Sequence, residues 1–236
     1  MIAATPGRLI AVGDVHGCSG ILSIVIHDIA PKPDDTFVFL GDLCNRGPDT
    51  KGVLDIVMAV SKVSSVHTVL GNHEEMILAA YQGGKDDHNY WCHFGGIETL
   101  ASFGVQSAKE IPIEYMQFIA GCVDYTESED YIFVHAGCEP EKPMDKQYST
   151  ILRWNGFKPS WPRHISGKTV VCGHSVQKQV FNNGHLLCID TGCGAWVGGR
   201  LTALDLKSGT IWQANSRSKK ATIKSLGDYN GKQLES

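Results

Sequence analysis

Five apolar segments of this 236-residue chain are each followed, within three residues, by a glycine and by polar residues, and this recurring pattern limits the possible folds. The segments cover residues 9–12, 37–40, 66–70, 131–134 and 170–172. Each has the length and composition of a buried strand, and the glycine supplies the backbone freedom for the following turn. Helical periodicity after the first two segments predicts a parallel sheet with crossover helices. We therefore expect the polar residues after these strands to gather at one sheet edge.

The residues that follow the strands are of the types that bind metal ions. They are Asp14, His16, Asp42, Asn72, His135 and His174. Carboxylate oxygens together with imidazole nitrogens favour manganese, with iron or zinc as alternatives, over calcium or magnesium alone. Asp14 and His16 can face one ion, Asp42 can bridge two ions, and the remaining three would complete the second. Two divalent ions can clamp a phosphoryl oxygen and activate a water, so the pattern predicts phosphate hydrolysis without a protein nucleophile.

Composition excludes several other classes of protein. A content of 42% hydrophobic and 19% charged residues is typical of a soluble globular protein. The net charge of −4 gives no electrostatic reason to bind nucleic acid or an anionic membrane. We find no apolar run of about 20 residues and no leader pattern. The eight cysteines lack C-x2-C spacing, so we expect reduced thiols in a cytoplasmic protein.

The rest of the chain is expected to form one domain. Residues 83–130 have a mainly helical pattern, and further strands follow up to about residue 213. Residues 138–168 contain four prolines and little periodicity, which predicts a long functional loop. Residues 207–209 form a plausible hairpin turn. We predict a catalytic domain over residues 1–215, followed by a polar tail over 216–236.

The order of the motifs adds a resemblance to a known family. They read GDVHG from residue 13, GDLCNRG from 41, GNHE from 71, HAG from 135 and GH from 173. This order resembles the phosphoprotein phosphatase branch of the calcineurin-like metallophosphoesterases. That branch includes prokaryotic serine/threonine protein phosphatases and symmetrical diadenosine tetraphosphatases. The resemblance covers about residues 9–213 and implies an α/β sandwich of two mixed β-sheets flanked by helices.

The resemblance also implies roles for single residues. It assigns the predicted ligands to two divalent ions, with Asp42 as the bridge, and implies attack on phosphorus by a hydroxide that bridges the ions. His73 would be the general acid, while Arg46 and Asn72 would contact the phosphate. A second phosphate-binding arginine is expected from the long loop. Arg153 is the first candidate, followed by Arg163 and then Arg200, whereas His185 is expected to be structural.

Asn45 departs from the pattern of the protein phosphatases. An acid typically stands at this place and orients the catalytic histidine. Asn45 could accept a hydrogen bond from the His73 imidazole, but it cannot stabilise a positive charge there, so His73 should be less basic. Diadenosine tetraphosphatases similarly lack the acid, and their leaving group is a nucleotide phosphate that needs less protonation. This departure favours a phosphoanhydride substrate.

Other segments leave the substrate open. The sequences IDTGC at 189–193 and GGRLTAL at 198–204 resemble the tetraphosphatases, whereas GGIETL at 95–100 resembles the small protein phosphatases. Our first expectation is a hydrolase of phosphoserine and phosphothreonine proteins. The alternative is a symmetrical bis(5'-nucleosyl)-tetraphosphatase, and a non-catalytic metal-binding scaffold is a third possibility. The expected partner is thus a phosphoprotein or a dinucleoside polyphosphate, with no nucleic acid and no membrane.

Overall fold

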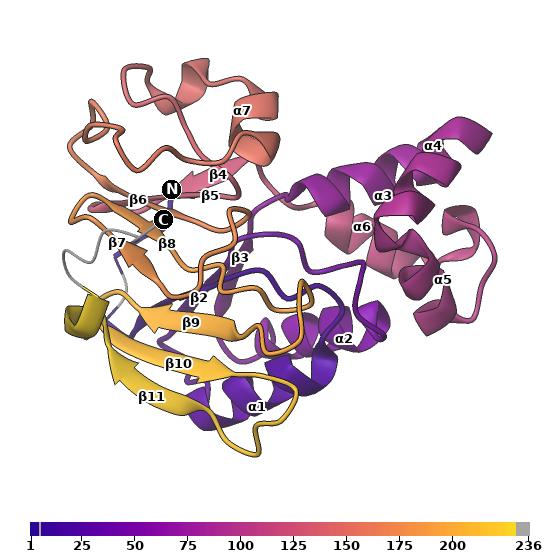
Figure 1. The fold of residues 1–236 in the computed structure, drawn as a ribbon, viewed down its shortest axis with the longest axis horizontal. Helices are drawn as coiled ribbons and strands as arrows, with labels where there is room; N and C mark the ends of the chain where they lie inside the picture. Colours follow the sequence, from indigo (N-terminus) through magenta and orange to yellow (C-terminus); the bar gives the residue numbers. More distant parts are fainter. Residues whose placement is uncertain (5, 230–236) are drawn as a thin grey trace.

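Two mixed β-sheets form the centre of the computed structural model, which describes residues 1–4 and 6–229 (Figure 1). The first sheet has the order β11 (Thr222–Ser225), β10 (Thr210–Ala214), β9 (Leu201–Asp205), β1 (Leu9–Val12), β2 (Thr36–Phe39) and β3 (Ser65–Thr68). The second has the order β4 (Tyr125–Glu127), β5 (Tyr131–Val134), β6 (Thr169–Cys172), β8 (Leu186–Cys188) and β7 (Phe181–Asn182). Both sheets combine parallel and antiparallel pairs, which confirms the expected fold class.

The parallel strands bring chemistry-bearing loops together. β1, β2 and β3 are parallel neighbours in the first sheet, and β5, β6 and β8 are parallel neighbours in the second. The carboxyl ends of parallel neighbours lie at the same edge, where ligands commonly bind in open α/β sheets. The loops that leave these ends carry the motifs of the sequence.

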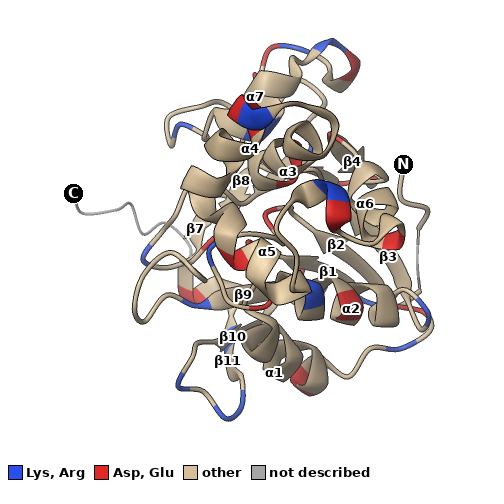
Figure 2. Ribbon diagram, turned by 90° about the vertical axis from the view of Figure 1, so that its right-hand side faces the viewer, with Lys and Arg blue, Asp and Glu red and all other residues tan. Residues whose placement is uncertain are grey.

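Helices flank the two sheets (Figure 1). They are α1 (Ser19–Ile29), α2 (Thr50–Val60), α3 (Asn72–Gln82), α4 (Lys85–Trp91), η1 (Cys92–Gly96), α5 (Ile97–Phe103), η2 (Ala108–Glu110), α6 (Ile113–Ala120), η3 (Met144–Lys146), α7 (Ser149–Trp154) and η4 (Leu226–Tyr229). The group from α3 to α6 projects to one side of the sandwich, and α7 lies above the second sheet (Figure 1). In Figure 2 the acidic and basic residues are interspersed along the ribbon, and no stripe of one sign runs across this view.

Alternating side chains of the strands fill separate layers of the core. In β1, Ile10 and Val12 pack with the helices, whereas Ala11 faces the second sheet. Val38 from β2 and Phe133 from β5 belong to that same layer between the sheets. Because successive strand side chains point to opposite faces, one short apolar strand supplies both layers. Each fully buried large side chain stabilises the fold by roughly 1.5–3 kcal/mol.

Several elements differ from the sequence-based expectation. The segment 138–168 was expected to be a loop, but it contains η3 and α7. The segment 216–236 was expected to be a tail, but β11 pairs antiparallel with β10, and the buried Tyr229 ends the described chain. Residues 230–236 of that predicted tail lie outside the described residues. Within the described ranges, no helix is both long and apolar enough to cross a membrane.

Candidate metal centre and active site

The loops after five strands bring the predicted metal ligands together. Asp14 and His16 follow β1, Asp42 follows β2, Asn72 begins α3 after β3, His135 follows β5 and His174 follows β6. The side chains of five of these six are buried, and that of His174 is partly buried. Carboxylate, amide and imidazole groups from both sheets therefore meet in a single site.

One group of donors joins the two sheets. Nε2 of His135 lies 3.3 Å from Oδ1 of Asp42 and 3.0 Å from Oδ1 of Asn72. Nδ1 of His174 lies 3.2 Å from that Nε2 and 3.1 Å from Oδ1 of Asn72. Asp42, His135 and His174 each offer one ligand atom within 4.8 Å of the others, and they could hold a metal ion.

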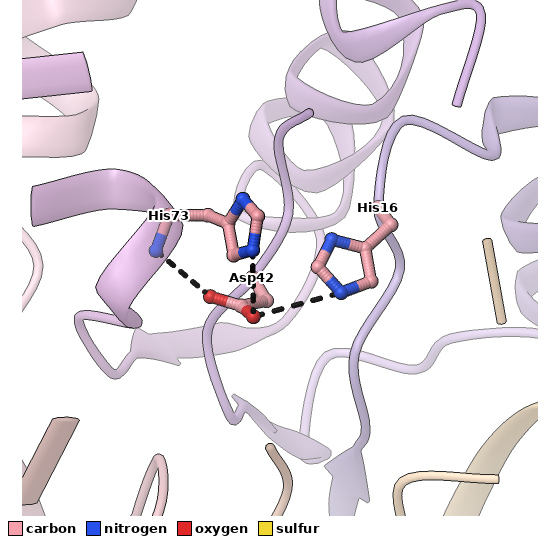
Figure 3. Close-up of side chains that lie close together, drawn as sticks. All are labelled: His16, Asp42 and His73. Atoms are coloured by element: carbon pink, nitrogen blue, oxygen red, sulfur yellow. Dashed lines mark hydrogen bonds and ion pairs between the residues drawn. The ribbon is translucent and has the colours of Figure 1, made fainter. Parts of the chain in front are cut away.

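A second group uses the other oxygen of Asp42. Oδ2 of Asp42 lies 3.5 Å from Nε2 of His16 and 3.9 Å from Nε2 of His73 (Figure 3). These three residues also offer ligand atoms within 4.8 Å of one another. Asp42 thus belongs to both groups, which is the geometry a bridging carboxylate requires. Asp14 lies beside the first group, where both of its oxygens accept the backbone N–H of His174, at 3.2 and 3.1 Å.

The ring orientations of the three candidate histidine ligands fit a metal site. Nδ1 of His16 lies 3.2 Å from the carbonyl oxygen of Cys44, and Nδ1 of His135 lies 2.8 Å from that of Leu40. Nε2 of His174 lies 3.1 Å from the Trp154 carbonyl oxygen. A carbonyl can only accept, so each ring donates one N–H to the backbone and turns its other nitrogen toward the centre. Metal-binding histidines are typically fixed in this way.

The backbone at the centre is unusual. Positive φ angles occur at His16 (47°), Asp42 (50°), Asn45 (69°), Arg46 (66°) and His174 (60°), and Ala30 is the only other such non-glycine residue in the described chain. Left-handed conformations are costly for L-residues and persist only where the surrounding structure enforces them. Their concentration here indicates that the loops are held in place for side-chain positioning.

Glu74 is one residue that enforces this loop conformation. Its carboxylate accepts backbone N–H groups of Asp42 at 2.7 Å, Leu43 at 2.8 Å, Gly71 at 3.1 Å and Cys44 at 3.2 Å. Burial, followed by the nearby Asp42 carboxylate, raises the pKa of Glu74. The sequence contains Glu74 in the GNHE motif, but sequence reasoning gave it no role. It acts as a buried anchor for the loop after β2.

The site carries a concentration of buried acid groups. Burial, and then the charge of Asp190, raises the pKa of Asp14 well above its usual range. Burial raises the pKa of Asp190 to about 6. Burial alone would also raise the pKa of Asp42, but His135 and then His73 hold it well below its usual value. Three carboxyl groups in one buried site are the donor chemistry that divalent cations balance, so the residues present fit such ions.

Asp190 was missed in the sequence analysis. It comes two residues after the end of β8 at Cys188, just as the other acids come shortly after the ends of their strands. Its Oδ1 accepts the backbone N–H of Gly192 at 2.9 Å, and the residue is only 3% exposed. The same strand-end rule applied to the segment 186–189 would have identified it.

Asn45 is fully buried, and its hydrogen bonds correct our expectation. Its Oδ1 accepts the indole N–H of Trp91 at 2.9 Å and the Thr99 hydroxyl at 2.9 Å. Its amide nitrogen lies 2.8 Å from Nδ1 of His73. Indole N–H and amide NH₂ groups can only donate. Asn45 therefore donates to the imidazole instead of accepting from it, and neutral His73 carries its hydrogen on Nε2.

The two imidazoles near Oδ2 of Asp42 are neutral at neutral pH. Burial lowers the pKa of His16 to about 3 and that of His73 to about 4, although Asp42 acts in the opposite direction on both. By contrast, the pKa of His135 is raised to about 10: burial opposes this shift, but the Asp42 charge and hydrogen bond outweigh it. The positive charge of the site is thus concentrated on His135 and Arg46.

The arginines have different surroundings. Nη1 of Arg46 lies 2.9 Å from Nε2 of His16, which places its guanidinium at the centre. The structure does not bring Arg153 there. Its guanidinium is ion-paired with Asp124 and with Glu75, the latter at 3.0 Å, so carboxylates already neutralise its charge.

The remaining candidates have partners elsewhere or lie at the surface. Arg163 donates to the carbonyl oxygens of Gly167 at 3.0 Å and Gly184 at 3.2 Å, and Arg200 is exposed. Nε2 of His185 lies 2.9 Å from the Trp161 carbonyl oxygen, in keeping with a structural role.

Comparison with curated proteins finds two kinds of tetraphosphatase. A symmetrical bis(5'-nucleosyl)-tetraphosphatase of Bordetella pertussis is 43% identical over 79 residues, which are 33% of this chain and 28% of that protein. The asymmetrical bis(5'-nucleosyl)-tetraphosphatase PrpE of Oceanobacillus iheyensis is 27% identical over 224 residues, which are 81% of this chain and 86% of that protein. The chain thus matches under a third of the first relative's length but most of the second's.

Solved structures share the fold. A crystal structure provisionally assigned as a diadenosine tetraphosphatase has a TM-score of 0.70 and 24% identity, with 92% of this chain and 97% of that chain covered. A serine/threonine phosphatase of Saccharomyces cerevisiae has a TM-score of 0.57 and 16% identity, covering 92% of this chain and 79% of that one. The sequence profile described as calcineurin-like phosphoesterase matches residues 7–199. On this evidence, the chain belongs to the calcineurin-like phosphoesterase family.

Proposed function

We propose that the protein hydrolyses dinucleoside tetraphosphates at the central phosphoanhydride bond, with two divalent metal ions, manganese foremost, held by the strand-end cluster. Its tetraphosphatase relatives support this reading over our first expectation of a phosphoserine and phosphothreonine phosphatase. In the reaction, an oxygen from water bonds to phosphorus and the P–O bond to the second nucleoside diphosphate breaks. One substrate molecule and one water give two nucleoside diphosphates.

Each ion has a defined set of candidate ligands. Asp14, His16 and Asp42 would hold the first ion. Asp42 together with Asn72, His135 and His174 would hold the second. Divalent ions bound there would supply Lewis-acid activation of water and neutralisation of phosphate charge. The protein's part is to fix the donor atoms, and the backbone carbonyl contacts of the three histidines serve this purpose.

The Asn45–His73 contact is the observation that carries the choice of substrate. Asn45 donates a hydrogen bond to Nδ1 of His73. If that nitrogen were protonated, its N–H would face the N–H of the Asn45 amide, so His73 stays neutral. A neutral imidazole is a weak acid, although its Nε2–H can still donate a hydrogen bond to a departing oxygen. A phosphate leaving group has a pKa of about 6 and needs little protonation, whereas a serine alkoxide needs a proton. The contact therefore suits a phosphoanhydride.

Arg46 would bind the phosphates of the substrate. Its guanidinium is always charged and presents several N–H donors to phosphate oxygens. Its position beside His16 places this charge next to the second donor group. Arg46 would therefore hold a phosphate oxygen while the neutral Nε2–H of His73 faces the departing one.

A substrate panel tests the proposal. The manganese-loaded protein should convert diadenosine tetraphosphate to ADP at a higher kcat/KM than it dephosphorylates phosphoserine or phosphothreonine peptides. Chromatography of the products would separate two ADP from the ATP and AMP of asymmetrical cleavage. Faster turnover of the phosphopeptides would overturn the proposal. If the products are ATP and AMP, the proposed substrate class stands, but the proposed cleavage at the central bond is wrong.

A further inference from the structure

An exposed tryptophan lies on the loop before β9. The Trp196 indole packs over Gly192, where a Cβ would lie 2.7 Å from the ring, so a side chain at residue 192 would displace it. Trp196 nevertheless remains 47% exposed, and the neighbouring Val197 is 89% exposed. Contiguous exposed apolar side chains commonly mark binding surfaces. One face of the indole is thus supported by backbone while much of the ring stays accessible.

The same loop touches the metal centre. A Cβ on Gly194, two residues before Trp196, would lie 2.6 Å from the Cβ of His16. The Cys193 thiol also lies 3.4 Å from the carbonyl oxygen of Val15, in the GDVHG motif. The exposed indole is therefore attached to a loop that contacts His16 of the second donor group directly.

A second aromatic surface lies beside Arg46. The rings of Tyr90 and Phe94 have centroids 4.9 Å apart, and these residues are 52% and 37% exposed. Phe94 lies where the helix is interrupted, and the following Gly95 has a φ of 93°. The Gly95 carbonyl accepts the backbone N–H of Arg46 at 3.2 Å, and a Cβ on Gly95 would lie 3.2 Å from Cγ of Arg46.

The two aromatic surfaces are linked through Arg46, the expected phosphate ligand, and His16, a candidate metal ligand. Gly95 contacts Arg46, Arg46 lies 2.9 Å from His16, and His16 is packed against Gly194. Each surface thus lies within two residues of a glycine that contacts Arg46, the expected phosphate ligand, or His16, a candidate metal ligand. Nucleobases stack on exposed aromatic rings with little dependence on sequence, because every base has a π-face. An aromatic surface near each end of this chain of contacts would suit a polyphosphate with a base at each end.

We propose that Trp196 on one side and the Tyr90–Phe94 pair on the other stack the two nucleobases of a dinucleoside polyphosphate whose phosphates lie at Arg46. This inference rests on the proposed function and adds the residues that would select the substrate. A single stacked base typically changes affinity by about 10-fold when the aromatic ring is removed. The two surfaces would favour a two-ended substrate over a mononucleotide or a phosphopeptide.

The first experiment uses the variants Trp196→Ala and Phe94→Ala. Each should raise the KM for diadenosine tetraphosphate by about 10-fold and change kcat much less, because stacking acts on substrate binding. Ile223→Ala on the edge strand β11, which is 65% exposed, is the control and should leave KM unchanged. A loss confined to kcat, or equal KM changes in the control, would overturn the proposal.

A second experiment separates this proposal from the hydrolytic one. Calorimetric titration in Mg²⁺ compares ADP with pyrophosphate, which lacks the nucleoside. The wild type should bind ADP about 10-fold more tightly, and the double variant of Trp196 and Phe94 should lose that preference. If the wild type shows no preference for ADP, the stacking proposal fails. If the preference is present and is lost in the double variant while diadenosine tetraphosphate is not cleaved, stacking stands and the proposed function fails.

Discussion

The amide nitrogen of Asn45 lies 2.8 Å from Nδ1 of His73, while the Asn45 oxygen accepts hydrogen bonds from Trp91 and Thr99. These two donors fix the orientation of the Asn45 amide, because in the flipped orientation its NH₂ group would face the indole N–H of Trp91. A buried residue on α4 thus determines which nitrogen of the catalytic-site imidazole carries hydrogen. Under the proposed function, the contact would connect the helical group of residues 85–103 with the choice of leaving group.

Replacing Asn45 with Asp should reverse this hydrogen bond. An aspartate can keep the two bonds from Trp91 and Thr99 and accept a third from Nδ1–H of His73. The negative charge should raise the pKa of His73 from about 4 and make protonated imidazole available near neutral pH. Turnover of phenyl phosphate should increase more than that of p-nitrophenyl phosphate. Leaving-group series for both proteins measure this, and a uniform change across the series would contradict it.

Replacing His73 with Asn should slow turnover without removing a metal ion. A general acid or hydrogen-bond donor at this place contributes about 10²–10⁴-fold to rate. Nε2 of His73 is 3.9 Å from Asp42, farther than the 3.5 Å of His16. We therefore expect the variant to retain both equivalents of manganese when measured by mass spectrometry of the metal content. Loss of one equivalent would identify His73 as a ligand.

Replacing Glu74 with Gln should destabilise the protein and weaken metal binding. The Gln amide NH₂ would face backbone N–H groups that now donate to a carboxylate. Hydrogen bonds to a charged group are worth about 1.5–3 kcal/mol each, so we expect a loss of about 3 kcal/mol in the free energy of unfolding. Urea denaturation measures it. Glu75→Gln on the same helix removes the same charge from a more exposed side chain and should cost less than about 1 kcal/mol. Equal losses would contradict this role.

The Arg8–Asp35 pair predicts a pH dependence of stability away from the metal centre. Burial would raise the pKa of Asp35, but hydrogen bonds from Arg8 and the backbone N–H of Lys32, together with the Arg8 charge, hold it below its usual value. The folded pKa is thus below the unfolded pKa of about 3.9. The stabilisation is present above that pH and is lost as the pH falls through the folded pKa. The thermal unfolding of wild type and Asp35→Asn should differ at about pH 5, and this difference should shrink as the pH falls below about 3.9. A constant difference would contradict the linkage.

The sequence was most informative where one local pattern decided the structure. The expected strand at 131–134 coincides with β5, and the turn at 207–209 joins two antiparallel neighbours, β9 and β10. Strand-end glycines and polar residues indicated that the candidate ligands would meet, because parallel strands share their carboxyl ends. The ligands come from two sheets, however, and not from the edge of a single sheet. By contrast, β7 has only two residues, and β11 lies in a polar segment without clear alternation.

Contacts between distant residues could not be predicted in this way. The direction of the Asn45 hydrogen bond depends on Trp91 and Thr99, which lie 46 and 54 residues away along the chain. The pairing of Arg153 with Asp124 and Glu75 also depends on packing between separate elements. The residue types show which functional group each position carries. Its hydrogen-bond or ion-pair partner, however, depends on the tertiary structure.

Metal content of the purified protein tests the two-ion centre most directly. Wild type, His16→Ala and His174→Ala would be saturated with Mn²⁺, freed of excess ion and analysed by mass spectrometry, with Ile223→Ala as the control. Because His16 and His174 lie in different donor groups that share Asp42, each variant should lose a different ion. We predict two equivalents in the wild type and the control, and one in each histidine variant. A single equivalent in the wild type, or two retained in both histidine variants, would contradict the account.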